Sequence, residues 1–124
     1  MIKKYNQYIK ENIEIDPFGE EDWEDDSPII RIAKKQGLPL DQITELYCDN
    51  NRLTSLEGIE KLTNLKNLDC SFNRLTNLDG IENLINLIIL HCYNNNFSDD
   101  YKSYLKKLKI KYIIISTEMT IIKL

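Results

Sequence analysis

The sequence lacks the features that would place it in a membrane or on nucleic acid. None of its apolar runs approaches the ~20 residues that a membrane-spanning helix needs. Its N-terminus has no continuous apolar core of the signal-peptide type. The net charge of -4 argues against a general nucleic-acid binder, which would carry a basic stripe. We therefore expect a single domain of the cytoplasm with no membrane or nucleic-acid partner.

What the sequence has instead is an internal repeat of 22 residues. Residues 43–64, 65–86 and 87–109 align column by column, and their first parts read ITELYCDNNRL, LKNLDCSFNRL and LIILHCYNNNF. Residues 110–124 form a partial fourth unit, which matches one residue late. A fixed period of this length with the pattern L-x-x-L-x-C-x-x-N-x-L is typical of leucine-rich repeats. Each unit needs a neighbour to bury its apolar side, so the units are expected to stack.

Each unit is expected to open with a short strand whose side chains alternate between core and surface. The leucine and cysteine columns then point inward. Asn51, Asn73 and Asn95 mark the turn that follows each strand. A buried amide there can bond the backbone groups that a curved segment leaves unpaired, so we expect a stacked asparagine ladder. The return segments are short and interrupted by glycine, which favours 3-10 or extended turns.

Metal and disulfide chemistry are not expected from the cysteines. Cys48, Cys70 and Cys92 share one inward column, and their side chains run parallel, so a disulfide would need distortion. His91, the single histidine, faces outward by strand alternation and cannot join them around one zinc ion. We therefore expect reduced core cysteines, no metal and no cofactor.

Residues 1–42 are expected to cap the first repeat. Residues 1–13 have apolar side chains at helical spacing, and a second helix opens with Ser27 as its N-cap and ends before Gly37. Between them, residues 20–26 place six acids around Trp23. This segment is either a solvated loop with Trp23 over the edge of the core, or a motif that docks on a basic partner.

The last repeat departs from the pattern. Ser98 can cap a helix that carries acids in its first turn, with Tyr101, Tyr104, Leu105 and Leu108 as its apolar stripe. Residues 110–115 are expected to form a fourth strand. Because an open apolar edge invites aggregation, we expect residues 119–124 to cover it as a strand or loop.

The repeats resemble the short 22-residue class of leucine-rich repeats found in phosphatase-regulating proteins and bacterial internalins. The segments LEGIEKLTN and LDGIENLIN carry this resemblance. It implies an α/β solenoid with a short curved parallel sheet on its concave face, and an N-terminal helical cap. It also implies a protein partner. A second resemblance links KKYNQYIKE to the capsid-targeting leaders of tailed bacteriophages, which implies cleavage after Glu11 and a place in the virion.

The outward side chains of the strands and turns form the candidate binding surface, because tyrosine and arginine with scattered acids are typical of interfaces. Ser71 is expected to face outward beside Asp49 and Tyr93. The full set of candidate contacts is Tyr47, Asp49, Arg52, Asp69, Phe72, Arg74, His91 and Tyr93.

We therefore expect a non-catalytic module that binds a protein through its concave face. The alternative is a viral structural or capsid-packaged protein directed by its N-terminal helix. Asp69, His91 and Ser71 suggest a catalytic triad, but a shallow sheet offers no oxyanion site and no enclosed pocket. The chain is expected to be a monomer, or a weak dimer paired through the edge of residues 110–115.

Overall fold

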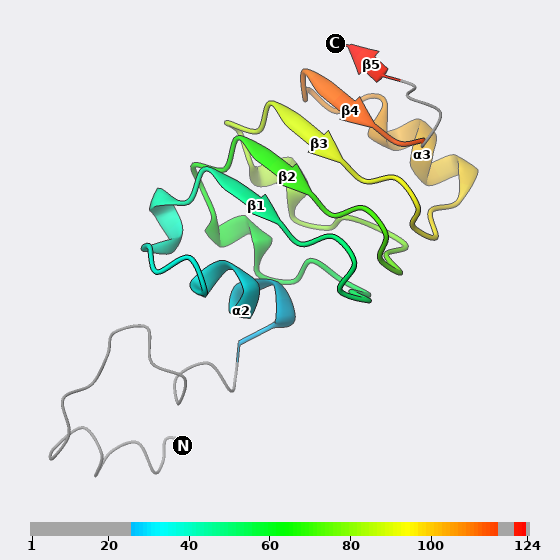
Figure 1. Cartoon of the computed structure of the whole chain (residues 1–124). Coiled ribbons are helices and arrows are strands. Elements are labelled where there is room, and N and C mark those ends of the chain that lie inside the picture. Colours follow the sequence, from blue (N-terminus) through cyan, green and yellow to red (C-terminus); the bar gives the residue numbers. More distant parts are fainter. Residues whose placement is uncertain (1–25, 117–120, 124) are drawn as a thin grey trace, which may run out of the picture.

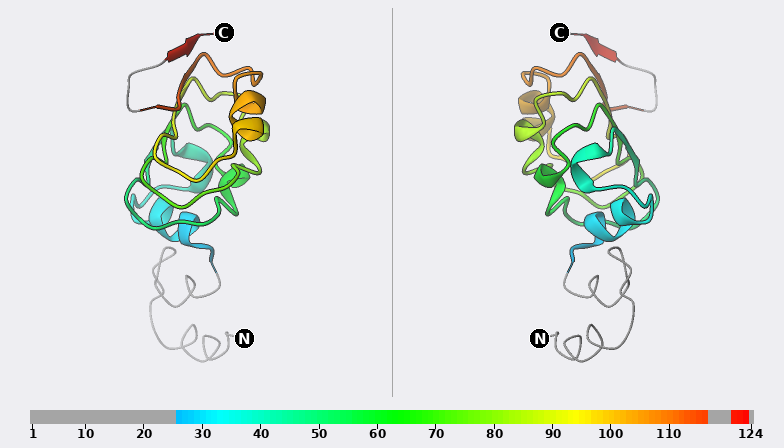
Figure 2. Two further views of the ribbon diagram at one scale, coloured as in Figure 1. Left: turned by 90° about the vertical axis from the view of Figure 1, so that its right-hand side faces the viewer. Right: turned by 90° about the vertical axis from the view of Figure 1, so that its left-hand side faces the viewer.

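The computed structural model describes residues 26–116 and the backbone of residues 121–123. The helix expected over residues 1–13, the leader-like segment and Trp23 lie outside this part of the chain. The elements follow one another along a stack of coils that runs from lower left to upper right in Figure 1, with the sheet on one side and the helices on the other (Figures 1 and 2). In chain order they are α2 (Pro28–Lys34), η2 (Leu40–Gln42), β1 (Glu45–Tyr47), η3 (Ile59–Lys61), β2 (Asn67–Asp69), η4 (Ile81–Asn83), β3 (Ile89–His91), α3 (Asp99–Leu105), β4 (Tyr112–Ile114) and β5 (Ile121–Lys123).

The sheet confirms the repeat. Its strand order is β1-β2-β3-β4-β5, and the first four strands are parallel. Leu46 pairs with Leu68, Leu68 with Leu90, and Leu90 with Ile113. The first two steps span 22 residues and the third spans one more, as the late match of the fourth unit predicts. The sequence period therefore sets the strand register directly.

The core lies between the sheet and the return segments. The leucine column of the strands is buried at Leu46, Leu68 and Leu90. The three cysteines are buried beside it and unpaired, as predicted. Burial raises the pKa of Cys48 and of Cys92 to about 12, because the interior disfavours a thiolate. The return segments form the 3-10 helices η3 and η4, which also agrees with the prediction.

The asparagine ladder forms in two of the three predicted positions. Asn73 is buried, and its Oδ1 accepts hydrogen bonds from the backbone N–H groups of Asn51 (3.0 Å) and Leu53 (2.9 Å). Asn95 accepts one from Leu75 N–H at 2.9 Å. Each of these side-chain amides thus accepts hydrogen bonds from the backbone of the preceding coil. Asn51 has no coil before it, so it is exposed and donates only to Asp49 O in its own turn, contrary to the prediction of a buried rung.

The N-terminal cap is helix α2. The Ser27 hydroxyl accepts from Ile30 N–H, as predicted, and also donates to Glu57 O in the first return segment. Ile29, Ile30 and Ala33 are buried against the first coil. Gly37 has φ +76°, the left-handed conformation expected just beyond the helix.

The C-terminal end is closed by α3 and β5. Ser98 caps α3 by accepting from Tyr101 N–H at 3.1 Å, as predicted. The Tyr101 hydroxyl in turn accepts from Leu78 N–H at 2.7 Å and so ties α3 to the preceding coil. Tyr104 is 42% exposed, so it does not belong to the buried stripe. Strand β5 pairs antiparallel with β4, as expected of a terminal strand, and occupies the edge through which a dimer was expected.

Candidate functional site

The eight predicted contact residues all lie on one surface, here called the sheet face: the outward side chains of β1–β4 and of the turns that follow them. They differ in exposure. Tyr47 (56%) and Phe72 (45%) are the most exposed aromatic side chains on it, and Arg52 and Arg74 are exposed at its rim. The other four, which are half-buried, are Asp49, Asp69, His91 and Tyr93.

Three of these residues form an aromatic cluster, defined here as Phe72, His91 and Tyr93. The Phe72 and Tyr93 rings meet edge to face, with centroids 5.4 Å apart and planes at 77°. The centroids of His91 and Tyr93 are 6.5 Å apart. Edge-to-face pairs at such distances are favourable beyond the area they bury. The structure therefore joins side chains from two neighbouring coils into one apolar patch.

Phe72 lies in a strained backbone conformation. Its φ is +58°, and its counterparts Asn50 and Asn94 in the adjacent coils have φ of +60° and +58°. All three sit where the chain turns out of the strand. Asparagine tolerates this left-handed region, whereas a bulky side chain there is an outlier that costs on the order of 1–3 kcal/mol. The sequence does show that a phenylalanine replaces asparagine in this column of the repeat. It does not show that the φ angle there is positive.

The residues considered as a triad do not assemble into one. His91 Nδ1 lies 3.9 Å from Asp69 Oδ2, beyond hydrogen-bonding distance. Asp69 Oδ1 instead accepts from Ser71 N–H at 3.0 Å. Ser71 is only 1% exposed, so its predicted outward position is wrong. Its hydroxyl oxygen is buried as well.

Tyr47 stands at the α2 end of the sheet face and has partners that the sequence did not indicate. Its hydroxyl donates to Glu45 Oε1 at 3.2 Å, and this bond raises the pKa of the Tyr47 phenol because the carboxylate disfavours a phenolate. A hollow of about 330 Å³ lies between Tyr47 and α2, lined also by Ile32 and Gln36. Gln36 Nε2 donates to Glu45 O at 2.9 Å. The 22-residue sequence pattern does not predict this bond between the segment after α2 and strand β1.

Within residues 26–116, no three His, Cys, Asp or Glu side chains gather as metal ligands. No helix in the same part of the chain has the length and apolar character needed to cross a membrane. What the face presents is the aromatic cluster with Asp69 beside His91, together with the half-buried Asp49 and two exposed arginines.

Comparison with known proteins identifies the repeat. Two overlapping stretches, residues 41–83 and 63–107, match the family model described as Leucine Rich repeats (2 copies). Together the two stretches cover more than half of the chain. No curated protein matches the chain significantly.

Proposed function

Because the chain belongs to the leucine-rich repeat family, we propose that it is a non-catalytic module that binds a partner protein through its sheet face. Repeats of this family generally mediate protein–protein interactions. The observation that carries the proposal is Phe72, a large aromatic side chain that is 45% exposed and held at φ +58°. Such strain is often associated with a functional surface.

The environment of Phe72 is that of an interface hot spot. Its counterparts in the neighbouring coils are asparagines, which adopt the same turn at lower cost, so folding alone gives no reason for a phenylalanine. Together with Tyr93 it offers a rigid aromatic anchor with few rotatable bonds. Interface energy is concentrated in such aromatic anchors, which are surrounded by a polar rim.

The charges around the cluster indicate the chemistry of the partner. The carboxylate of Asp69 lies 3.9 Å from Nδ1 of His91 in the aromatic cluster, and Asp49 is half-buried in the preceding coil. A ring face next to a carboxylate is favourable for a guanidinium or ammonium group. We therefore propose that the partner places an arginine or lysine side chain, with an adjoining apolar residue, on the aromatic cluster.

No catalytic step belongs to the proposal. His91 and Asp69 do not bond to each other, and the Ser71 hydroxyl is buried and unavailable to a substrate. A hydrolytic reaction would need an accessible nucleophile next to its base.

The proposal is tested by capture from the native host lysate with the wild-type chain and with Phe72→Asn, which introduces the residue found at the two equivalent turns. Tyr104→Asn is the matched control, because Tyr104 is exposed to a similar extent (42%) but lies on α3. We expect a partner that is lost with Phe72→Asn and retained with Tyr104→Asn. Titration calorimetry with that partner then measures the loss, which should exceed tenfold for an aromatic hot spot. Equal binding by Phe72→Asn and wild type would refute the proposal.

A further inference from the structure

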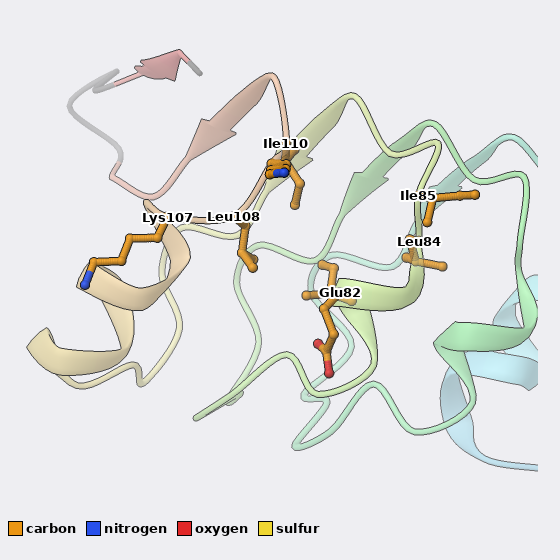
Figure 3. Close-up of a pocket in the computed structure, with 8 residues that line it drawn as sticks. Glu82, Leu84, Ile85, Lys107, Leu108 and Ile110 are labelled. Atoms are coloured by element: carbon orange, nitrogen blue, oxygen red, sulfur yellow. The ribbon is translucent and has the colours of Figure 1, made fainter.

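A pocket of about 380 Å³ opens on the return side of the solenoid, between η4 and the chain that follows α3 (Figure 3). It is here called the return-side pocket. Leu84, Leu108 and Ile110 contribute apolar walls. Lys107 and Lys109 also line the pocket, and together they outweigh the single acid Glu82 in the same lining. Its volume falls at the lower end of the range for ligand pockets and is large enough for one aromatic side chain.

The pocket follows from the irregular third repeat. In the first two coils the 3-10 helices pack directly on each other, since a Cβ built on Gly80 would lie 3.1 Å from Ile59 Cγ2. After η4 the next return segment is instead α3, in a coil that is one residue longer. Helix α3 does not continue the stack of 3-10 helices, and the space beside η4 stays open.

An exposed isoleucine stands at the pocket. Ile85 is 87% exposed and lines the pocket, whereas the matching residue of the first repeat is Thr63. An apolar side chain so exposed, beside a cavity and two cations, marks a docking surface for a segment that is both apolar and acidic. It lies on the opposite side of the coil from the sheet face, so it is separate from the proposed partner site.

We propose that the return-side pocket binds residues 20–26 of a second copy of this chain, with Trp23 in the cavity and its flanking acids on Lys107 and Lys109. Residues 20–26 read EEDWEDD and contain the only tryptophan in the sequence. The segment supplies a large aromatic group for the cavity and negative charge to balance the excess of lysine over the single Glu82 in the lining. A buried tryptophan contributes about 150–250 Å² of contact, enough to anchor a short segment.

The position of the segment favours a second copy over the same chain. Asp26 is held at the α2 end, where its Oδ2 lies 2.8 Å from Lys34 Nζ. The pocket is lined by the residues that follow α3, and helices α2 and α3 lie at opposite ends of the stack (Figure 1). Trp23 is three residues from Asp26, so its backbone reaches about 10 Å. The hollow beside Asp26 is lined by Glu57 and Glu60 against the single cation Lys61, so its excess of negative charge disfavours an acidic segment. The resulting contact joins the α2 end of one copy to the α3 end of the next.

A head-to-tail contact of this kind allows a test with two complementary variants. Trp23→Ala keeps the pocket and lacks the anchor, while Lys107→Glu/Lys109→Glu keeps the anchor and lacks the basic edge. Only the second variant has a tryptophan, so its emission reports docking without interference. We expect that adding the Trp23→Ala chain moves this emission to shorter wavelength. We also expect native mass spectrometry to show a 1:1 complex that cannot grow further.

The chain that supplies the pocket is here called the acceptor. Three acceptor variants, all carrying Trp23→Ala, distinguish the contribution of the two lysines, that of the apolar contact and that of the overall charge. Adding Lys107→Glu/Lys109→Glu should weaken docking roughly tenfold, as expected when two peripheral ion pairs become repulsive. Adding Ile85→Ser should weaken it without any change of charge. Adding Lys61→Glu/Lys66→Glu, which alters net charge equally at exposed sites outside the pocket, should leave it unchanged.

The inference fails if mixing the complementary variants produces no emission shift. It also fails if the lysine reversal in the acceptor has no more effect than the Lys61→Glu/Lys66→Glu control. A wild-type emission that is already at short wavelength and does not vary with protein concentration would assign the pocket to the segment of the same chain, and so overturn the second-copy assignment. None of these outcomes depends on the partner of the sheet face.

Discussion

Asn51, Asn73 and Asn95 occupy the same position in successive repeats but differ in their hydrogen bonds. Replacing each in turn by alanine therefore compares one substitution in three environments. In Asn73→Ala, the amide that accepts from Asn51 N–H and Leu53 N–H is lost, together with the bond that its Nδ2 donates to Cys48 O. The Leu53 N–H is fully buried, and leaving it unpaired costs about 1–3 kcal/mol, while the other two groups cost about 1 kcal/mol each. We expect Asn73→Ala to lower the free energy of unfolding by about 3–5 kcal/mol.

The other two positions supply the internal scale. Asn51 makes one exposed bond within its own turn, so Asn51→Ala should cost no more than about 1 kcal/mol. Asn95 accepts one bond, from Leu75 N–H, and donates one to Cys70 O of the preceding coil, both in part-buried sites, so Asn95→Ala should cost about 2 kcal/mol. The expected order of destabilisation is therefore Asn73, then Asn95, then Asn51.

Urea unfolding followed by far-ultraviolet circular dichroism measures all three free energies on the same scale. A small domain has about 5–15 kcal/mol in total, so the Asn73→Ala midpoint should fall steeply while that of Asn51→Ala barely moves. Equal losses for the three variants would refute the reasoning, because they would mean that the amide acts through its own turn and not through the preceding coil.

Three further outcomes are expected. Phe72→Asn should raise the free energy of unfolding by about 1 kcal/mol, since it removes left-handed strain, and a loss of stability in the same urea assay would contradict the strain assignment. Gly58→Ala should lower the free energy of unfolding by about 2 kcal/mol or more, because a Cβ there would lie 2.7 Å from Ile30 Cγ1. Gly37→Ala should lower it by only about 1 kcal/mol, because a Cβ there would have nothing within 4 Å. Burial raises the pKa of Cys70 well above its usual value, so iodoacetamide at pH 8 should alkylate this thiol only after unfolding; rapid alkylation of the folded chain, seen by intact mass, would count against the buried column.

The fold could be derived from the sequence because one period carries most of it. Apolar side chains every 22 residues must face one core, and this condition aligns Leu46, Leu68 and Leu90 without any further information. The N-cap residues of the helices could also be predicted from the sequence. Ser27 and Ser98 each precede a helix and each accept the backbone bond that their position predicts.

What could not be derived depends on the neighbouring coils. The alternation of the preceding strand predicts that Ser71 faces outward, yet in the folded stack it is only 1% exposed. Asn51 matches the ladder motif but has no preceding coil to serve. The positive φ of Phe72 and the bond from Gln36 to Glu45 are also set by how one coil meets the next. A linear pattern specifies which residues stack, but not which of them the stack covers.

The antiparallel direction of β5 limits how such an array can lengthen. A further coil of the same kind would have to bring a parallel strand to the outer edge of β4, and β5 already occupies that edge in the opposite sense. Helix α2 similarly covers the first coil from the other end. Tandem duplication of a 22-residue unit is therefore accommodated only between the existing coils, where both faces of the new unit meet matching leucine and asparagine columns. Variants with an extra copy of residues 65–86 inserted after residue 86 are the natural route to a longer binding surface.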